Sequence, residues 1–163
     1  VYYVSIGWGV SSVIVNNGKF IVGTRGISGE IGENITEDGE NVHMHCSFEL
    51  LIEKCRPYLA APVEEALIKS FANDARVREI VLESADVLAK QLDGITNALG
   101  CDRVILMGGI CAFGSEYAER INKYFNMYPK GFARKVEMSR HENDCFVGMG
   151  KVLCDGAIAA MLI

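Results

Sequence analysis

A long amphipathic helix that leads directly into a buried strand is the sequence feature that most constrains the fold. Apolar or small residues recur at helical spacing over residues 77–99, and Gly100 ends this predicted helix. The run Arg103–Met107 follows, and its short apolar stretch before Gly108-Gly109 is typical of a buried parallel strand. We therefore predict an α/β fold in which helices cover a sheet with parallel strands. The helix face expected to be buried comprises Val77, Ile80, Val81, Ser84, Val87, Leu88, Leu92, Ile95 and Leu99.

The amino-terminal segment predicts an antiparallel meander of three strands. Residues Tyr2–Ile6 and Gly9–Val15 are rich in Val, Ile, Tyr and Ser, a composition that favours strands. Asn16-Asn17-Gly18 is a strong hairpin signal because Asn and Gly accept positive φ, and a third strand should follow over Lys19–Gly23. With a further strand over Ala133–Met138, the expected sheet is mixed and has helices on its faces. The other predicted helices cover residues 47–58, 62–71, 115–125 and 149–162.

Composition excludes several classes of protein. The chain has 163 residues, enough for one domain, and half of them are hydrophobic. A net charge of −5 without a cluster of Lys and Arg argues against a nucleic-acid surface, and no apolar run is long enough to cross a membrane. The six cysteines lie mostly in apolar runs, which favours buried thiols in a reducing, cytoplasmic compartment. Because the first residue is Val1 rather than Met, we expect a piece of a longer protein.

Two glycine turns could approach a ligand. Gly7 and Gly9 flank Trp8 between two predicted strands, where backbone amides could cradle a phosphate, although a plain hairpin is the simpler interpretation. Gly108-Gly109 follows a parallel strand, and ligands of open α/β sheets bind outside the carboxyl ends of strands. A tight strand-to-helix turn is the alternative for this second pair.

A third segment gathers the residue types that bind zinc. Residues 24–42 predict a long irregular loop, and the run His43-Met44-His45-Cys46 follows it, with Glu49 close behind. Two of the three histidines in the chain lie here, beside a cysteine and several carboxylates. In an extended loop, His43 and His45 would project to the same side. A polar surface loop with incidental histidines is the alternative.

Taken in order, these segments resemble the second half of proteins of the ROK family, the repressors and sugar kinases. The specific part is the run Gly26-Ile27-Ser28-Gly29-Glu30-Ile31-Gly32, which matches the family's Gly-x-x-Gly-Glu-x-Gly. Weaker matches are Gly7-Trp8-Gly9-Val10, Gly108-Gly109 and Gly156-Ala157. The resemblance implies an actin-like ATPase lobe, which is ribonuclease H-like. Residues 1–163 would be the single carboxy-terminal domain of a two-lobed protein that closes on a sugar.

The resemblance assigns sugar contacts to three carboxylates. Glu30 would accept hydrogen bonds from sugar hydroxyls. Glu33 occupies the position of a family His that touches the sugar and helps to hold a structural zinc ion. Glu49 lies one residue from the position expected for a sugar-binding Glu. The sequence departs from the family pattern at both of these positions.

The same resemblance frames the metal question. His43 and His45 fall on the family's Cys-x-Cys positions, and Cys46 stands for the third Cys, so Glu33, His43, His45 and Cys46 could form a zinc site with new ligands. Alternatively, the metal site has been lost and the loop holds itself by hydrogen bonds.

Two functional hypotheses follow from the resemblance, and neither assigns a catalytic residue to this chain. The first is the sugar-sensing effector domain of a ROK-type transcriptional regulator, which binds a sugar or sugar phosphate and reaches DNA only through a missing amino-terminal module. Trp8 favours it, since its bulk would crowd a phosphate. We also expect a homo-oligomer and no membrane partner.

The second hypothesis is the carboxy-terminal half of an ATP-dependent, glucokinase-like sugar kinase. The catalytic Asp would then lie in the missing first lobe, ATP and Mg²⁺ would be required, and Gly7, Gly9, Gly108 and Gly109 would contact the nucleotide. A third, simpler alternative is a degenerate homologue that binds no sugar and serves assembly.

Overall fold

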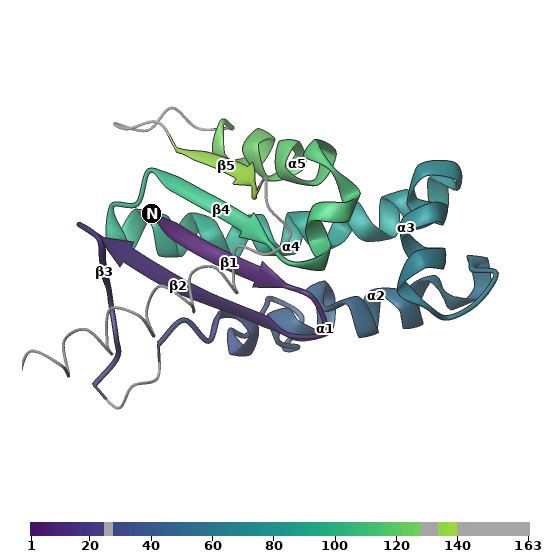
Figure 1. The fold of residues 1–163 in the computed structure, drawn as a ribbon, viewed down its shortest axis with the longest axis horizontal. Helices are drawn as coiled ribbons and strands as arrows, with labels where there is room; N and C mark the ends of the chain where they lie inside the picture. Colours follow the sequence, from purple (N-terminus) through teal and green to yellow (C-terminus); the bar gives the residue numbers. More distant parts are fainter. Residues whose placement is uncertain (25–27, 128–133, 140–163) are drawn as a thin grey trace, which may run out of the picture.

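A mixed five-stranded sheet forms the centre of the described part of the chain. The computed structural model describes residues 1–24, 28–127 and 134–139 (Figure 1). Strand β1 pairs antiparallel with β2 and parallel with β4, and the strand order is β3-β2-β1-β4-β5. The predicted mixed sheet with its antiparallel meander is therefore confirmed. The strand bounds are β1 Tyr2–Ile6, β2 Val10–Asn16, β3 Lys19–Phe20, β4 Arg103–Met107 and β5 Lys135–Met138.

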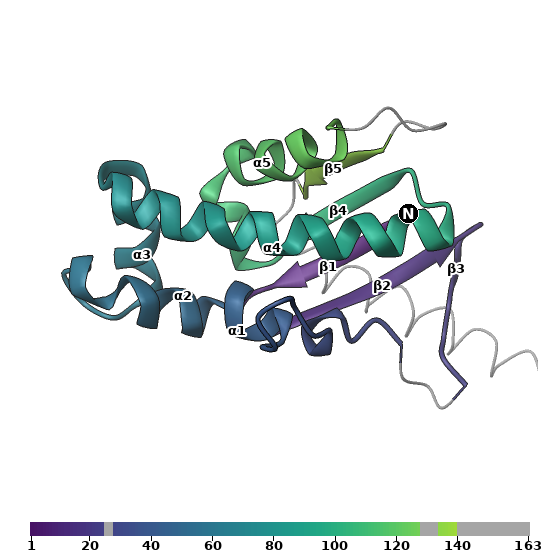
Figure 2. The ribbon, with the colours of Figure 1, turned by 180° about the vertical axis from the view of Figure 1, so that it is seen from behind.

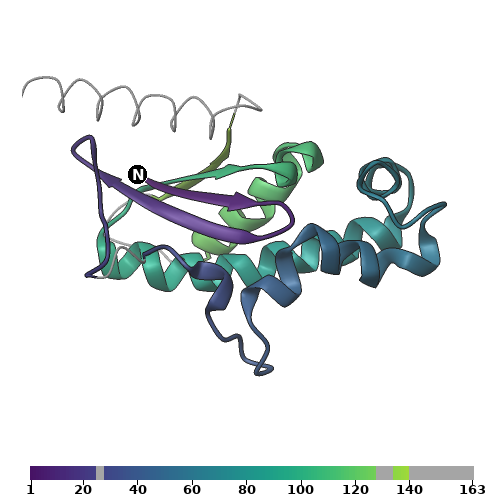
Figure 3. The same cartoon turned by 60° about the horizontal axis from the view of Figure 1, so that its bottom comes forward.

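The longest helix runs beneath the sheet. Figures 2 and 3 show α4 and α5 on the same face of the sheet, while α2 and α3 lie toward the amino-terminal end of α4. None of the helices in the described ranges is long and apolar enough to cross a membrane. The helices are α1 Val42–Cys46, α2 Phe48–Cys55, α3 Glu64–Asn73, α4 Ala75–Leu99 and α5 Ser115–Phe125; the 3₁₀ turns are η1 Ile31–Glu33, η2 Arg56–Tyr58 and η3 Gly109–Phe113.

Both ends of α4 have clear local causes. Asp74 caps the amino terminus, where its carboxylate accepts a hydrogen bond from the Arg76 amide at 2.8 Å. Gly100 ends the helix at φ 63°, a left-handed conformation that glycine adopts without steric cost. Between these ends most of the predicted apolar face packs into the core, whereas Val87 is only partly buried and Leu99 is exposed.

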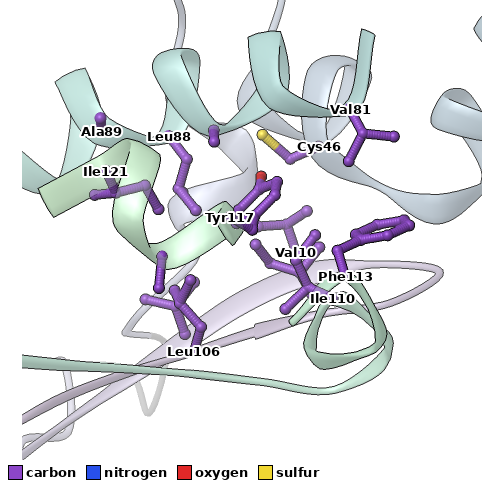
Figure 4. Close-up of a cluster of buried hydrophobic side chains, with 14 of the residues drawn as sticks. Val10, Cys46, Val81, Leu88, Ala89, Leu106, Ile110, Phe113, Tyr117 and Ile121 are labelled. Carbon is purple, nitrogen blue, oxygen red and sulfur yellow. The ribbon is translucent and has the colours of Figure 1, made fainter. Parts of the chain in front are cut away.

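The core lies between α4, α5 and the sheet. In Figure 4, Leu88 of α4 and Ile121 of α5 point toward Leu106 of β4, and Tyr117 lies among them. The Tyr117 hydroxyl forms a 2.9 Å hydrogen bond with the Ser84 hydroxyl, so that this polar atom is satisfied inside the core. Burial of these apolar side chains fixes the sheet against its helices.

Three strand predictions differ from the structure in their extent. Strand β2 spans Val10–Asn16, one residue later than the predicted Gly9–Val15. Strand β3 ends at Phe20 rather than Gly23, although the Ile21 amide still donates to the Ile14 carbonyl at 3.0 Å. Phe20, Ile21 and Val22 are exposed, so no packed face extends the strand. Strand β5 begins at Lys135, and the helix predicted over residues 149–162 lies outside the described residues.

The thiols of Cys46 and Cys55 should resist alkylation in the native protein. Burial raises the pKa of Cys46 to about 12 and that of Cys55 to about 11. At pH 8 the Cys46 thiolate is then only about 1 in 10⁴ of the population, and the thiolate is the reactive form. We expect mass spectrometry after iodoacetamide treatment at pH 8 to find both residues unmodified, and fully modified once urea is added. Rapid native labelling of Cys46 would contradict its placement in the core.

Candidate functional site

The segment that carries Glu30 lies tightly against strand β2. The Ser12 amide donates to the Gly29 carbonyl at 2.7 Å, and the Ser12 hydroxyl donates to the same oxygen at 2.7 Å. A Cβ atom on Gly29 would lie 1.8 Å from the Ser12 carbonyl oxygen, and one on Gly32 would lie 2.5 Å from the Val10 carbonyl oxygen. Only glycine allows such an approach of one backbone to another. The two glycines therefore fix the position of the residues between them.

The packing of this segment on β2 leaves two carboxylates exposed to solvent. Glu30, just before η1, and Glu33, its last residue, are exposed, whereas Ile31 between them is buried in the core. Across the described ranges, no hydrogen bond or ion pair engages the Glu30 carboxylate, while Glu33 accepts a long 3.5 Å contact from the Asn41 amide. Glu30 is thus held by its backbone and leaves both carboxylate oxygens available to a ligand.

The two glycine turns come together at the carboxyl ends of β1 and β4. Figure 1 shows both strand ends at one edge of the sheet. Gly108 has φ 85°, and a Cβ atom there would lie 2.6 Å from the Ile6 carbonyl oxygen. The Phe48 amide donates to the Gly7 carbonyl at 2.8 Å, which ties α2 to the first turn. The second glycine turn therefore lies against the end of β1, directly before the first turn.

The β1–β2 turn is open to solvent. Trp8 is 63% exposed, and a Cβ atom on Gly7 or Gly9 would meet nothing within 4 Å. Neither glycine has positive φ, so packing among the residues that the structure describes does not require glycine at either position. Glu49 is also exposed, in the first turn of α2.

One acidic residue at the second turn was missed in the sequence. Glu64 begins α3, and its Oε1 atom would lie 3.2 Å from a Cβ atom on Gly109. Its only sequence signal is that of an acidic residue in the first turn of a helix, which is common and carries no functional information. The second glycine turn therefore has a negative charge beside it.

The four predicted zinc ligands do not share one site in this arrangement. Residues 43–46 belong to helix α1, which Asn41 caps by accepting the Met44 amide at 3.1 Å. The prediction of an extended segment is wrong here. Each residue of a helix is rotated by about 100° from the one before it. The side chains of His43 and His45 consequently point to nearly opposite sides of the helix instead of to the same side.

The remaining ligands have other partners. The Cys46 thiol points into the core near Tyr117 (Figure 4) and donates to the Ser84 carbonyl at 3.4 Å. The His45 Nε2 atom lies 3.2 Å from the Asp38 carboxylate. In the part of the chain that the structure describes, no three His, Cys, Asp or Glu side chains gather as a metal would require. As placed, Glu33, His43, His45 and Cys46 do not fit a single zinc ion. Zinc binding stays a prediction, which elemental analysis with His43→Ala as control tests.

Hydrogen bonds hold residues 34–42 in place. The Thr36 amide donates to the Glu40 carbonyl at 2.7 Å, and the Val42 amide donates to the Asn34 carbonyl at 2.9 Å. The Thr36 hydroxyl donates to the Asp38 carboxylate, which lowers the pKa of Asp38. Hydrogen bonds within residues 34–42 therefore fix the conformation of this loop.

A family model described as the ROK family matches residues 1–151. This chain belongs to the ROK family. Like the ROK sugar kinases among its structural neighbours, it has the actin-like fold predicted from the sequence.

Curated and solved relatives include both kinases and a regulator. The N-acetylmannosamine kinase of Yersinia pestis (strain Pestoides F) is 26% identical over 153 residues, which cover 87% of this chain and 52% of the relative. The ROK family glucokinase of Streptomyces griseus, solved with glucose and AMPPNP, has a TM-score of 0.70 at 16% identity. The match covers 87% of this chain and 56% of the glucokinase chain. A ROK family transcriptional regulator, a homologue of the E. coli MLC protein, has a TM-score of 0.66 at 13% identity, with coverages of 84% and 40%. The chain spans about half the length of the curated relatives it matches.

Proposed function

We propose that this chain is the sugar-recognising lobe of a ROK protein and that Glu30 accepts hydrogen bonds from sugar hydroxyls. The observation that carries the proposal is the exposed Glu30 carboxylate, which has no partner in the described ranges and whose backbone is fixed between Gly29 and Gly32. A preorganised acceptor loses little entropy when a ligand binds. Its negative charge also strengthens a hydrogen bond from a hydroxyl group.

The finer role that we propose is sugar sensing in a transcriptional regulator. Phosphate groups would meet the bulk of Trp8 at the first glycine turn and the carboxylate of Glu64 at the second. The negative charges of the Glu64 carboxylate and of a triphosphate would repel each other at such short range, which disfavours binding of the triphosphate. Sugar binding between two lobes would instead shift the equilibrium between conformations of the protein, and so alter DNA binding by a module elsewhere in it.

The second candidate is half of an ATP-dependent sugar kinase. One support is the N-acetylmannosamine kinase among the curated relatives. The other is the close approach of Gly108 to the carboxyl end of β1, where a Cβ atom on Gly108 would lie 2.6 Å from the Ile6 carbonyl oxygen. In that case the nucleotide would bind with Mg²⁺, and it would be contacted by Gly7, Gly9, Gly108 and Gly109. The catalytic Asp would lie outside this chain.

Calorimetry on the intact protein separates the two candidates. A sensor should bind D-glucose or N-acetyl-D-mannosamine and show no heat with Mg²⁺–AMPPNP, with or without the sugar. Saturable binding of Mg²⁺–AMPPNP that tightens in the presence of the sugar would favour the kinase.

Replacing Glu30 by glutamine should weaken sugar binding by about 10-fold to 100-fold in the intact protein. The amide keeps one acceptor and loses the charge, and a hydrogen bond to a charged group contributes about 1.5–3 kcal/mol. Titration calorimetry measures the change. Glu83→Gln is the matched control, since Glu83 is exposed on α4, and it should leave affinity unchanged. Equal affinity of Glu30→Gln and the wild type would remove Glu30 from the site.

A further inference from the structure

We infer that Ser12 is a positioning residue that orients Glu30 through the Gly29 carbonyl, with Tyr2 as its support. This inference rests on the proposed sugar site and adds two residues to it. Both belong to the meander, on strands β2 and β1, and neither is a predicted ligand contact.

The Gly29 carbonyl is the point at which the Glu30 backbone is held. This oxygen accepts the Ser12 amide at 2.7 Å, the Ser12 hydroxyl at 2.7 Å and the Ile31 amide at 2.8 Å. The carbonyl belongs to the peptide unit that continues into the Glu30 amide, and a peptide unit is planar. Fixing the oxygen therefore fixes the orientation in which the chain enters Glu30.

The direction of the hydrogen bonds follows from proton counting. A serine hydroxyl has one proton, and the Ser12 hydroxyl uses it on the Gly29 carbonyl. In the 2.6 Å contact between the Tyr2 and Ser12 hydroxyls, Tyr2 must therefore donate. Desolvation by burial raises the pKa of Tyr2, which keeps the phenol protonated for this role. The result is a series of hydrogen bonds in one direction, in which Tyr2 donates to Ser12 and Ser12 donates to the Gly29 carbonyl.

Two conservative variants remove these side-chain hydrogen bonds without removing the strand pairing. Ser12→Ala loses the hydroxyl but keeps the amide bond to Gly29, and Tyr2→Phe loses the donor but keeps the buried ring. Each should weaken binding of D-glucose or N-acetyl-D-mannosamine by the intact protein by about 3-fold to 10-fold, since each removes one neutral hydrogen bond. Ser12→Thr keeps the hydroxyl on a strand and should retain wild-type affinity.

A double-mutant cycle tests whether Ser12 acts through Glu30. In a Glu30→Gln background, Ser12→Ala should cause little or no further loss, because the charged acceptor that it orients is gone. Full additivity of the two losses would overturn the inference, as would a Ser12→Ala variant with lower thermal stability and unchanged affinity.

The cycle also separates this inference from the proposed function. If Glu30→Gln weakens binding and Ser12→Ala does not, the sugar site stands and the positioning role of Ser12 fails. If Glu30→Gln leaves affinity unchanged, the proposed site fails and the positioning role fails with it.

Discussion

Gly29→Ala is expected to lower the free energy of unfolding by about 3 kcal/mol or more and to abolish sugar binding. The added Cβ atom would lie 1.8 Å from the Ser12 carbonyl oxygen, which is backbone and cannot rotate away. Overpacking of this kind costs about 1–3 kcal/mol, and a non-glycine residue at φ 84° adds about 1–2 kcal/mol. The segment must leave β2 to relieve the clash, and Glu30 moves with it. Urea unfolding followed by circular dichroism measures the first effect, and calorimetry with the sugar measures the second.

Gly39→Ala is the matched control for this prediction. Gly39 has φ 88°, almost the value of Gly29, but a Cβ atom there would meet nothing within 4 Å. It should therefore show the cost of the backbone conformation alone, about 1–2 kcal/mol, with sugar affinity preserved. Equal losses for the two variants would show that the contact between Gly29 and Ser12 contributes nothing.

Asp93→Ala is expected to cost about 3–5 kcal/mol, because it removes a carboxylate that pairs with a buried guanidinium group. The Arg134 side chain is only 1% exposed and donates to the Asp93 carboxylate at 2.6 Å. It also donates to the Thr96 hydroxyl at 2.8 Å and lies 4.4 Å from the centre of the Phe125 ring. These contacts connect the residue just before β5 to α4 and α5. Chemical unfolding of the variant at neutral pH measures the loss.

An exposed ion pair provides the comparison. Glu79 lies 3.5 Å from Arg120 with 56% of its side chain exposed, so Glu79→Ala should change stability by less than about 0.5 kcal/mol. Replacing both partners, in Asp93→Ala with Arg134→Met, should recover part of the loss, since the buried guanidinium charge is removed as well. A small effect of Asp93→Ala alone, or no recovery in the double variant, would contradict the buried pair.

Elements with a clear apolar period were predictable from the sequence. The predicted strand Arg103–Met107 and the predicted helix over residues 115–125 have the observed bounds, because one is a short apolar run and the other has helical periodicity. Leu99 continues the apolar spacing of α4, yet it is exposed because it lies in the last turn of that helix, at the edge of the core. Spacing therefore identifies the face of a helix but not how far the core extends along it.

Helix α1 was not predictable by the same means. It has five residues, too few to display a helical period, and it depends on the Asn41 cap and on burial of Val42 and Cys46. The sequence predicts an extended segment here, and the predicted common direction of His43 and His45 is wrong because residues 42–46 form a helix. An error in secondary structure over five residues thus changed the expected geometry of a whole metal site.

For the candidate site, the sequence supplied the residues but not their supports. The glycine run around Glu30 was found through its resemblance to the family, whereas the contacts of Gly29 with Ser12 depend on the tertiary structure. The position of Glu64 beside Gly109 depends on how α3 packs, which no local pattern encodes.

The strand order has a consequence for the synthesis of this lobe on the ribosome. Strand β1 pairs with β2 at once, but its other edge pairs with β4, where Tyr2 faces Val104. At about 5–20 residues per second, roughly 5–20 s separate the appearance of the two strands. During that interval the backbone groups along one edge of β1 are unpaired, and such an edge can pair with another chain. The nascent meander is therefore a stage at which this lobe is open to strand pairing with another chain.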